Sequence, residues 1–352
     1  MERIVLGYTG SLETSAAIPW LADRYQAEVI AVVLDVGQRA ELVEIRERAL
    51  ALGARRCHVV DVREELVRDY VLRALQAGAL QDGRAPQPRS LVRPLIVRKL
   101  IDIARMEGAA AIAHCGDADR FAPAAQALAP FLRLLAPADA WEMSRAALVD
   151  YTRAHGVPAA GDKAAFEVDA NLWGRSLRLD PASPADRIEV PEELFALTRA
   201  PRYCPDQPAY LDIEFTEGVP VRANGIDMTL LEMIDSLETI AGAHGVGRIE
   251  LTRELVEAPA AVVLHVAHNE LSRFVISSDL HAVRDGISRA YAELIDGGKW
   301  FSHAREALDA FVAAVQPRVT GSVKLELSKG ACRAVECQPR SASVDGVLIE
   351  GR

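Results

Sequence analysis

The chain has 352 residues, of which 50% are hydrophobic and 26% are charged, a composition typical of a folded globular protein. Its net charge of −10 argues against a nucleic-acid partner, and no apolar run approaches the length of a membrane span. The length exceeds one ordinary hydrophobic core, so we expect two domains. Because the N-terminus leads directly into a strand-like run, we also expect a cytoplasmic protein.

Apolar strand runs alternate with helical stretches along the first half of the chain. Strands are expected at 4–8, 29–35, 57–61, 110–114 and 132–136, and helices at 14–25, 41–52, 64–76, 91–107 and 121–128. This alternation predicts the α/β class, with a parallel sheet covered by helices on both faces. Ligands of such sheets bind at the carboxyl ends of the strands. We therefore expect the loops at 9–15, 35–38 and 114–120 to open onto one edge and form one site.

The turn after the first expected strand is rich in small and hydroxyl-bearing residues. A strand, a small-residue turn and a helix N-terminus form a general anion cradle, because free backbone N–H groups and the positive end of the helix dipole meet there. A capped strand–helix turn without a ligand explains the same residues about equally well. The pattern G-x-x-x-x-G-K-[ST] is absent, which excludes an ordinary P-loop NTPase.

The second half of the chain follows a proline-rich connection and has an α+β pattern. We expect a hairpin of strands at 210–215 and 219–223, a helix over 230–243, and strands near 260–267 and 321–327. His265 and His268 fall in the third of these strands and are expected to be half-buried structural residues. The five cysteines show no C-x-x-C pair or zinc spacing. Cys332 and Cys337 lie close in sequence, and residues of a reduced strand explain them better than a disulfide does.

The turn at 7–15 resembles the pyrophosphatase loop, S-G-G-x-D-[ST]-S, of enzymes that split ATP into AMP and pyrophosphate. From Arg3 to about Lys329 the chain resembles the argininosuccinate synthase family in further blocks, which are AVVLDVGQ (31–38), ELVRDY (65–70), RPLI (93–96), AIAH (111–114), DANLWGRS (169–176), HGVGRI (244–249) and YAELI (291–295). The resemblance implies an ATP-dependent ligase. In that family the ureido oxygen of citrulline attacks the α-phosphate, pyrophosphate leaves, and the amine of aspartate displaces AMP.

The resemblance also implies domains and site residues. We expect a nucleotide-binding domain at 1–165, an α+β substrate and assembly domain at 166–330, and a short tail at 331–352. The cofactors implied are ATP and Mg²⁺, with Glu13 as the candidate metal ligand. No catalytic side chain is expected beyond positioning residues. The implied ATP-binding residues are Gly7, Tyr8, Thr9, Gly10, Ser11, Leu12, Glu13, Thr14, Ser15, Leu34 and Cys115. The implied substrate residues are Ser90, Arg120, Ser176, Asp117, Asp119 and Glu167.

Several of these positions depart from the family pattern. The loop at 114–121 is shorter and lacks the family's lysine and threonine, while Ala85 and Val256 stand where tyrosines are expected. Glu167 replaces a serine, and Asp117 and Asp119 place acids where the family favours anions. These departures predict a divergent ligase that adenylates a ureido or carboxyl oxygen, condenses it with an amine, and works poorly on citrulline plus aspartate. Genuine argininosuccinate synthesis and a nucleotide-binding protein without catalysis remain as alternatives.

Assembly is a separate expectation. The chain lacks the long C-terminal arm with which the family builds its tetramer, so we expect a homo-oligomer that is smaller or looser. The expected partners are small-molecule substrates, with no nucleic acid and no membrane.

Overall fold

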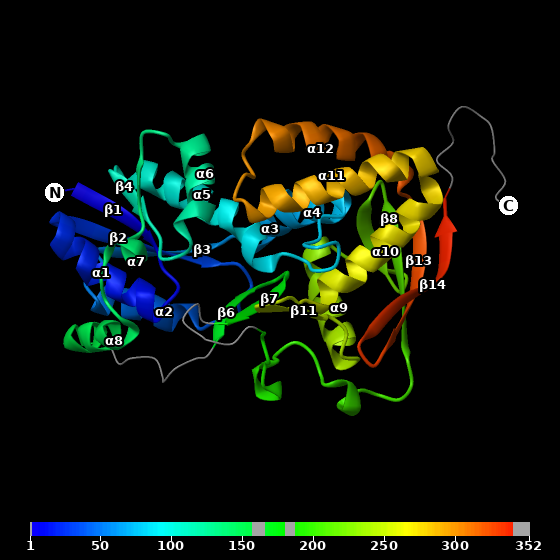
Figure 1. Cartoon of the computed structure of the whole chain (residues 1–352), viewed down its shortest axis with the longest axis horizontal. Helices are drawn as coiled ribbons and strands as arrows, with labels where there is room; N and C mark the ends of the chain where they lie inside the picture. Colours follow the sequence, from blue (N-terminus) through cyan, green and yellow to red (C-terminus); the bar gives the residue numbers. More distant parts are fainter. Residues whose placement is uncertain (1, 157–165, 180–186, 341–352) are drawn as a thin grey trace. The chain divides into compact units, whose positions relative to one another are not determined.

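The computed structural model describes residues 2–156, 166–179 and 187–340 (Figure 1). The chain forms two compact units, each assembled from separate stretches of sequence. Unit 1 comprises Met1–Arg63, Ser90–Ala164 and Asp296–Ser302, and unit 2 comprises Glu64–Arg89, Ala165–Ile295 and His303–Arg352. The domains expected at 1–165 and 166–330 stay a prediction, because periodicity does not reveal which distant segments pack together.

Unit 1 is built on a parallel sheet, as the alternating pattern predicted. Its strand order is β3-β2-β1-β4-β5, in which every neighbouring pair is parallel. The strands are β1 (Glu2–Gly7), β2 (Ala27–Asp35), β3 (Arg56–Asp61), β4 (Ala111–Ala113) and β5 (Arg133–Leu135). The strand order reverses between β1 and β4, and such a reversal is where open α/β sheets bind ligands.

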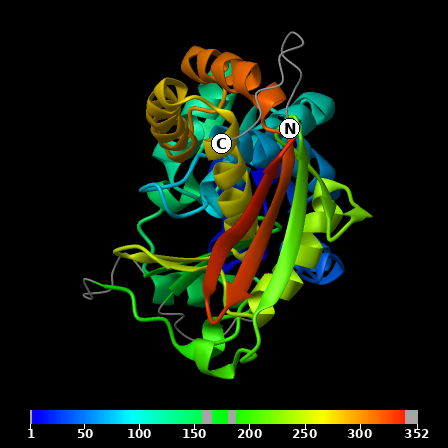
Figure 2. The same cartoon turned by 90° about the vertical axis from the view of Figure 1, so that its right-hand side faces the viewer.

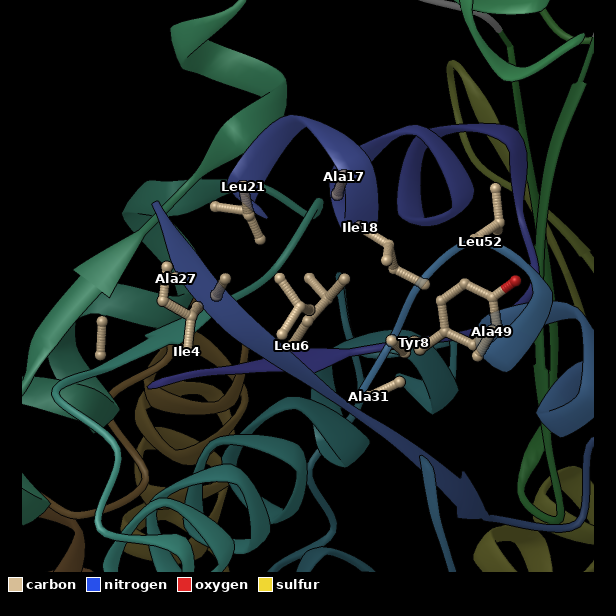
Figure 3. Packing of buried hydrophobic residues seen from close by; sticks show 14 of the residues in the cluster. Ile4, Leu6, Tyr8, Ala17, Ile18, Leu21, Ala27, Ala31, Ala49 and Leu52 are labelled. Carbon is tan, nitrogen blue, oxygen red and sulfur yellow. The ribbon is translucent and has the colours of Figure 1, made fainter. Parts of the chain in front are cut away.

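Helices cover both faces of this sheet. Alternate residues of β1 point to opposite sides, and they are apolar on both sides. Ile4 and Leu6 pack with residues of α1, and Ala49 and Leu52 lie in the same cluster next to Tyr8 (Figure 3). On the other face, Val5 packs with residues of α5 and α6. The helices of unit 1 are α1 (Leu12–Tyr25), α2 (Leu42–Ala51), α5 (Pro88–Glu107), α6 (Ala118–Leu128), α7 (Pro137–Ala140) and α8 (Arg145–Ala154).

Unit 2 contains two antiparallel sheets. The first has the order β10-β9-β8-β13-β14, and its long strands β8, β13 and β14 are coloured green through red in Figure 2. These strands are β8 (Ala209–Thr216), β9 (Val219–Ala223), β10 (Ile226–Asp227), β13 (Gly321–Ser328) and β14 (Ala331–Pro339). The second sheet has the order β11-β12-β7-β6, formed by β6 (Phe166–Asn171), β7 (Gly174–Leu179), β11 (Arg248–Glu250) and β12 (Glu254–Glu257). The predicted hairpin is confirmed, because β8 and β9 are antiparallel neighbours in the first sheet.

The helices of unit 2 confirm one prediction and correct another. The helix expected at 230–243 is α9 (Leu230–Ala243), which begins at a capping box formed by Thr229 and Glu232. The strand expected near 260–267 is wrong, because these residues belong to α10 (Pro259–Val275). His265 and His268 are accordingly fully buried on a helix rather than half-buried on a strand. The remaining helices are α3 (Arg63–Leu66), a π-helical turn (Val67–Val71), α4 (Leu72–Ala77), α11 (Ser278–Asp296), α12 (His303–Val315) and short 3-10 turns at Glu192–Leu194, Pro201–Tyr203 and Gln316–Arg318.

The described part of the expected tail contains a strand, as expected for Cys332 and Cys337. Residues 331–339 form β14, which pairs along its length with β13, so they belong to the sheet. Cys332 and Cys337 are both free thiols on this strand. Among the described helices, none combines the length and the apolar character that crossing a membrane requires.

Candidate nucleotide and substrate site

The turn between β1 and α1 has the geometry of an anion cradle. Gly10 has a φ of +79°, a conformation that favours glycine, and a Cβ there would lie 3.3 Å from Cγ1 of Ile45. Ser11 caps α1 by accepting a hydrogen bond from the backbone N–H of Thr14 at 3.2 Å. Within the described residues, the backbone N–H groups of Gly10, Leu12 and Glu13 have no hydrogen-bond acceptor. Leu12 and Glu13 lie in the first turn of α1 and Gly10 directly precedes its cap, so these donors lie where a helix N-terminus favours an anionic oxygen.

Hydroxyl groups cluster on the same turn. The Thr14 hydroxyl lies 3.3 Å from that of Thr9 and 3.1 Å from that of Ser11. The Ser15 hydroxyl is 3.2 Å from the phenol of Tyr8, and burial raises the pKa of that phenol. Tyr8 therefore stays protonated and can take part in hydrogen bonding without adding negative charge to the turn.

Glu13 lies on the same turn, and it is the predicted metal ligand. Its carboxylate lies 3.4 Å from Nη1 of Arg145, and both side chains are partly exposed. No cluster of three or more metal-ligating side chains occurs among the residues that the structure describes. A single carboxylate fits a magnesium ion that is carried mainly by nucleotide phosphates, which is how proteins usually bind this ion.

The loop after β2 lies at the same edge of the sheet and is held by its own side chains. The backbone N–H of Gly37 donates to Asp35 at 2.9 Å, and Gln38 donates to the carbonyl oxygen of Leu34 at 2.8 Å. Leu34 is partly buried and packs against the cluster formed with α5 and α6. Leu34 near the end of β2 and the cradle after β1 both lie at the carboxyl edge of the sheet, where an apolar side chain suits the flat face of a base.

The loop after β4 is short because Asp117 begins α6 directly. The Asp117 carboxylate accepts a hydrogen bond from the backbone N–H of Asp119 at 3.2 Å and so caps this helix. His114 stacks on Phe121 with ring centroids 4.1 Å apart, and its Nδ1 accepts from the N–H of Gly116. Burial lowers the pKa of His114 to about 4. The imidazole is thus neutral near pH 7, with its proton on Nε2.

Cys115 lies beside His114 in this loop and is a predicted ATP-binding residue. Burial raises the pKa of its thiol to about 12, so it remains protonated near neutral pH. A protonated thiol is a poor nucleophile, so Cys115 can contact a ligand but does not supply covalent chemistry.

Two predicted substrate residues of unit 1 meet at a residue that the sequence did not indicate. Nη1 of Arg120 lies 3.0 Å from both the carbonyl oxygen and the carboxylate of Asp296. The Ser90 hydroxyl donates to the same carboxylate at 3.3 Å, and Arg93 donates to Ser90 at 3.2 Å. The only local signal at Asp296 is an acid at the C-terminal end of α11, where the helix dipole disfavours negative charge.

The segment that carries Asp296 is fixed against Arg120. A Cβ at Gly298 would lie 2.0 Å from the carbonyl oxygen of Arg120, so only glycine fits there. Phe301 packs against the cluster formed with α5 and α6, and Trp300 is buried. These contacts hold Ser90, Arg120 and Asp296 in one place within unit 1.

The other predicted substrate residues lie in unit 2. Ser176 on β7 is buried, and its hydroxyl has no hydrogen-bond partner among the described residues. Val256 on β12 is its direct neighbour in the strand pairing. Glu167 lies at an exposed position of β6, and Ala85 is fully buried in a turn bridged to Gln81. An unpartnered buried hydroxyl is the kind of group that a bound ligand satisfies.

Comparison with known proteins gives matches along nearly the whole chain. Residues 3–158 match the family described as Arginosuccinate synthase N-terminal HUP domain, and residues 166–344 match Arginosuccinate synthase C-terminal domain. Argininosuccinate synthase of Dehalococcoides mccartyi strain 195 is 41% identical over 349 residues, which cover 95% of this chain and 86% of the relative. Argininosuccinate synthases of Chlorobium chlorochromatii and Symbiobacterium thermophilum are also 41% identical, over 94% and 95% of this chain and 86% and 87% of their own lengths.

A comparison with solved structures adds little. A protein described as a predicted subunit of tRNA methyltransferase from Methanocaldococcus jannaschii aligns with 44% of this chain and 76% of its own, with 11% identity and a TM-score of 0.31. A likeness this weak carries no argument about function.

Proposed function

Because the chain belongs to the argininosuccinate synthase family of ATP-dependent C–N ligases, which form AMP and pyrophosphate, we propose that it condenses citrulline with aspartate. The observation that carries the proposal is the anion cradle at the end of β1. Its free N–H groups and hydroxyls lie at the carboxyl edge of the sheet, where the loops after β2 and β4 also begin. This edge is where the phosphates of ATP would bind.

The expectation of a divergent ligase that works poorly on citrulline and aspartate is not supported. Relatives with the name argininosuccinate synthase match 94–95% of the chain at 41% identity, so the alternative of genuine argininosuccinate synthesis fits better. The departures that motivated the expectation are local. One of them, the acid at Asp117, acts as the cap of α6.

In the proposed reaction the protein's contribution is positioning and charge stabilisation. The ureido oxygen forms a bond to the α-phosphorus, and the bond from phosphorus to the pyrophosphate oxygen breaks. The amine of aspartate then bonds to the ureido carbon, and AMP leaves with the former ureido oxygen. The backbone N–H groups of Gly10, Leu12 and Glu13 would donate hydrogen bonds to phosphate oxygens, whose negative charge grows as pyrophosphate leaves. Glu13 would hold the Mg²⁺ that accompanies ATP.

The proposed citrulline contacts within unit 1 are Ser90 and Arg120. In unit 1, Ser90 and Arg120 both bond to Asp296, which orients their side chains in the absence of a ligand. Such contacts raise the rate by holding the ureido oxygen in line with the α-phosphorus.

The test is an assay that follows pyrophosphate, argininosuccinate and the oxygen transferred to AMP. Pyrophosphate release is measured with ATP and Mg²⁺ alone, with citrulline, with aspartate, and with both amino acids. We expect argininosuccinate by mass spectrometry only when all substrates are present, with turnover in the ordinary range of about 1–10³ s⁻¹. Citrulline labelled with ¹⁸O at the ureido position should pass its label to AMP. Pyrophosphate release that ignores citrulline but responds to another urea or carboxylate would contradict the proposal.

A further inference from the structure

The anion cradle contains no basic side chain of its own. Between Gly7 and Ser15 the only charged residue is Glu13, and its carboxylate pairs with Arg145. A leaving pyrophosphate gathers negative charge as the bond to the α-phosphorus breaks. Backbone N–H groups and hydroxyls stabilise part of that charge, and phosphoryl-transfer sites generally add a cation.

Arg48 of α2 supplies a cation at this place. Its Nη1 donates a hydrogen bond to the carbonyl oxygen of Gly10 at 3.1 Å, and it lies 3.7 Å from where a Cβ on Gly10 would be. The positive charge of Arg48 also acts on Tyr8, where it partly offsets the rise in pKa that burial causes. The guanidinium therefore lies against the turn, although 38 residues separate Arg48 from Gly10.

The packing of α2 fixes this placement. Ile45, one turn before Arg48, contacts Gly10, and Ala49 is fully buried in the cluster that contains Tyr8 (Figure 3). Residues one and three positions away thus anchor the helix on the sheet. Arg48 is held at the cradle by the same face of the helix.

The charge of Arg48 is uncompensated. Its neighbour Arg46 pairs with Glu47, whereas no carboxylate pairs with Arg48 in the described part of the chain. A guanidinium carries several N–H donors, and the bond to Gly10 uses only one nitrogen. A partly buried cation with spare donors next to an anion cradle is arranged to bind anionic oxygens.

We infer that Arg48 is a catalytic residue that binds the β- and γ-phosphates of ATP. As the bond between the α-phosphorus and the bridging oxygen breaks, its electron pair goes to that oxygen, and Arg48 stabilises the charge on the departing pyrophosphate. This inference rests on the proposed nucleotide site, but it is independent of which acceptor and amine are condensed.

A purely structural role makes a different prediction. If Arg48 only supports the backbone at Gly10, its removal would distort the whole turn and weaken the binding of ATP, pyrophosphate and AMP equally. If Arg48 contacts the outer phosphates, its removal weakens ATP and pyrophosphate but spares AMP, which lacks those phosphates. Comparing the ligands therefore separates the two roles.

The experiment measures binding of pyrophosphate, ATP and AMP by calorimetry, with Mg²⁺ present, to the whole protein and three variants. For Arg48→Gln we expect pyrophosphate and ATP affinity to fall about tenfold to hundredfold, with AMP affinity changed by less than about twofold. Arg48→Lys should keep part of the affinity because it retains a point charge. Arg46→Gln, on the same helix, is the matched control and should bind all three ligands normally.

Several outcomes would overturn the inference. Equal losses for AMP and pyrophosphate would assign Arg48 a bracing role, and no loss would remove it from the site. Should Arg48→Gln melt far below the unmodified protein, the same ligand comparison on Arg48→Lys decides the question. If the unmodified protein binds neither ATP nor pyrophosphate, the nucleotide site and this inference fail together. Binding without turnover on citrulline and aspartate would overturn only the proposed substrates.

Discussion

The two units use polar groups in opposite ways. In unit 2 the fully buried Glu257 accepts hydrogen bonds from the backbone N–H groups of Leu197 and Thr198, each at 2.8 Å, and from Arg175 at 2.7 Å. In unit 1 the cradle leaves backbone donors and Arg48 without anionic partners among the described residues. Polar groups with hydrogen-bond partners stabilise the fold, whereas polar groups without a partner at the carboxyl end of a strand are available to a ligand. The contrast predicts which polar residues are structural and which would bind a ligand.

The largest effect is expected where the buried network of unit 2 is broken. Glu257→Ala should lower the free energy of unfolding by about 3–5 kcal/mol, because it leaves the guanidinium of Arg175 and several buried N–H groups without an acceptor. Denaturant unfolding followed by circular dichroism measures the loss. Glu250→Ala, at an exposed position of β11, is the control and should change stability by less than about 0.5 kcal/mol. A loss at Glu257 as small as that of the control would show that the network is not structural.

The next effect concerns the cradle of unit 1. Gly10→Val should weaken ATP binding at least about a hundredfold, or about 2.7 kcal/mol, because a β-branched residue cannot adopt a φ of +79° without moving the turn. Its Cβ would also press on Ile45. Gly108→Val is a matched control with a φ of +62° and no atom near the new Cβ. It should lose stability but keep ATP affinity. Unchanged nucleotide affinity in Gly10→Val would place the ATP site elsewhere.

Acid should act on unit 2 through two buried histidines. Burial lowers the pKa of both His265 and His268 to about 3, and the positive charge of Arg284 acts in the same direction. Both rings are therefore neutral in the folded state, whereas in the unfolded state they take up protons below about pH 6.5. The unfolded state thus binds more protons between about pH 6.5 and pH 3. Over that window, lowering the pH should lower the free energy of unfolding by up to about 1.4 kcal/mol per pH unit for each histidine.

Urea unfolding at pH 7, 6 and 5 measures this slope. His265→Phe removes one titrating ring and keeps an aromatic side chain near Trp173, whose ring centroid is 5.9 Å from that of His265. Its stability should depend less steeply on pH than that of the unmodified protein. Parallel pH profiles for the two proteins would show that the carboxylates alone cause the acid response.

The sequence predicted unit 1 well because local signals determine it. Short apolar runs bounded by turns placed all the strands of the parallel sheet, and the position of the cradle followed from the order of strand, turn and helix. The helix α10 was missed because its apolar run is nearly continuous, and a buried helix and a buried strand then look alike over a short window. Length and the proline at its first position were the available signals.

The sequence did not indicate that Asp296 contacts Arg120 or that Arg48 contacts Gly10. Asp296 meets Arg120 across 176 residues, and Arg48 reaches Gly10 across 38 residues. Such contacts depend on how helices pack on the sheet, which residue spacing does not encode. Of the site, the sequence predicted the turn that offers donors, and the structure adds the side chains that surround it.

The smallest expected effect separates two roles of Asp117, which the sequence predicted as a substrate residue and the structure places as the cap of α6. Asp117→Ala should lower the free energy of unfolding by about 1 kcal/mol, because the first turn of the helix loses its acceptor. Asp117→Asn should cost much less, since asparagine caps helices about as well as aspartate. The KM for each amino acid in Asp117→Asn then reports the charge alone. If Asp117 is only a cap, both KM values stay within about twofold of those of the unmodified protein. A larger shift in KM at unchanged stability would show that the carboxylate also takes part in substrate recognition, and Asp119→Asn, exposed in the same turn, provides the control for a general effect of charge.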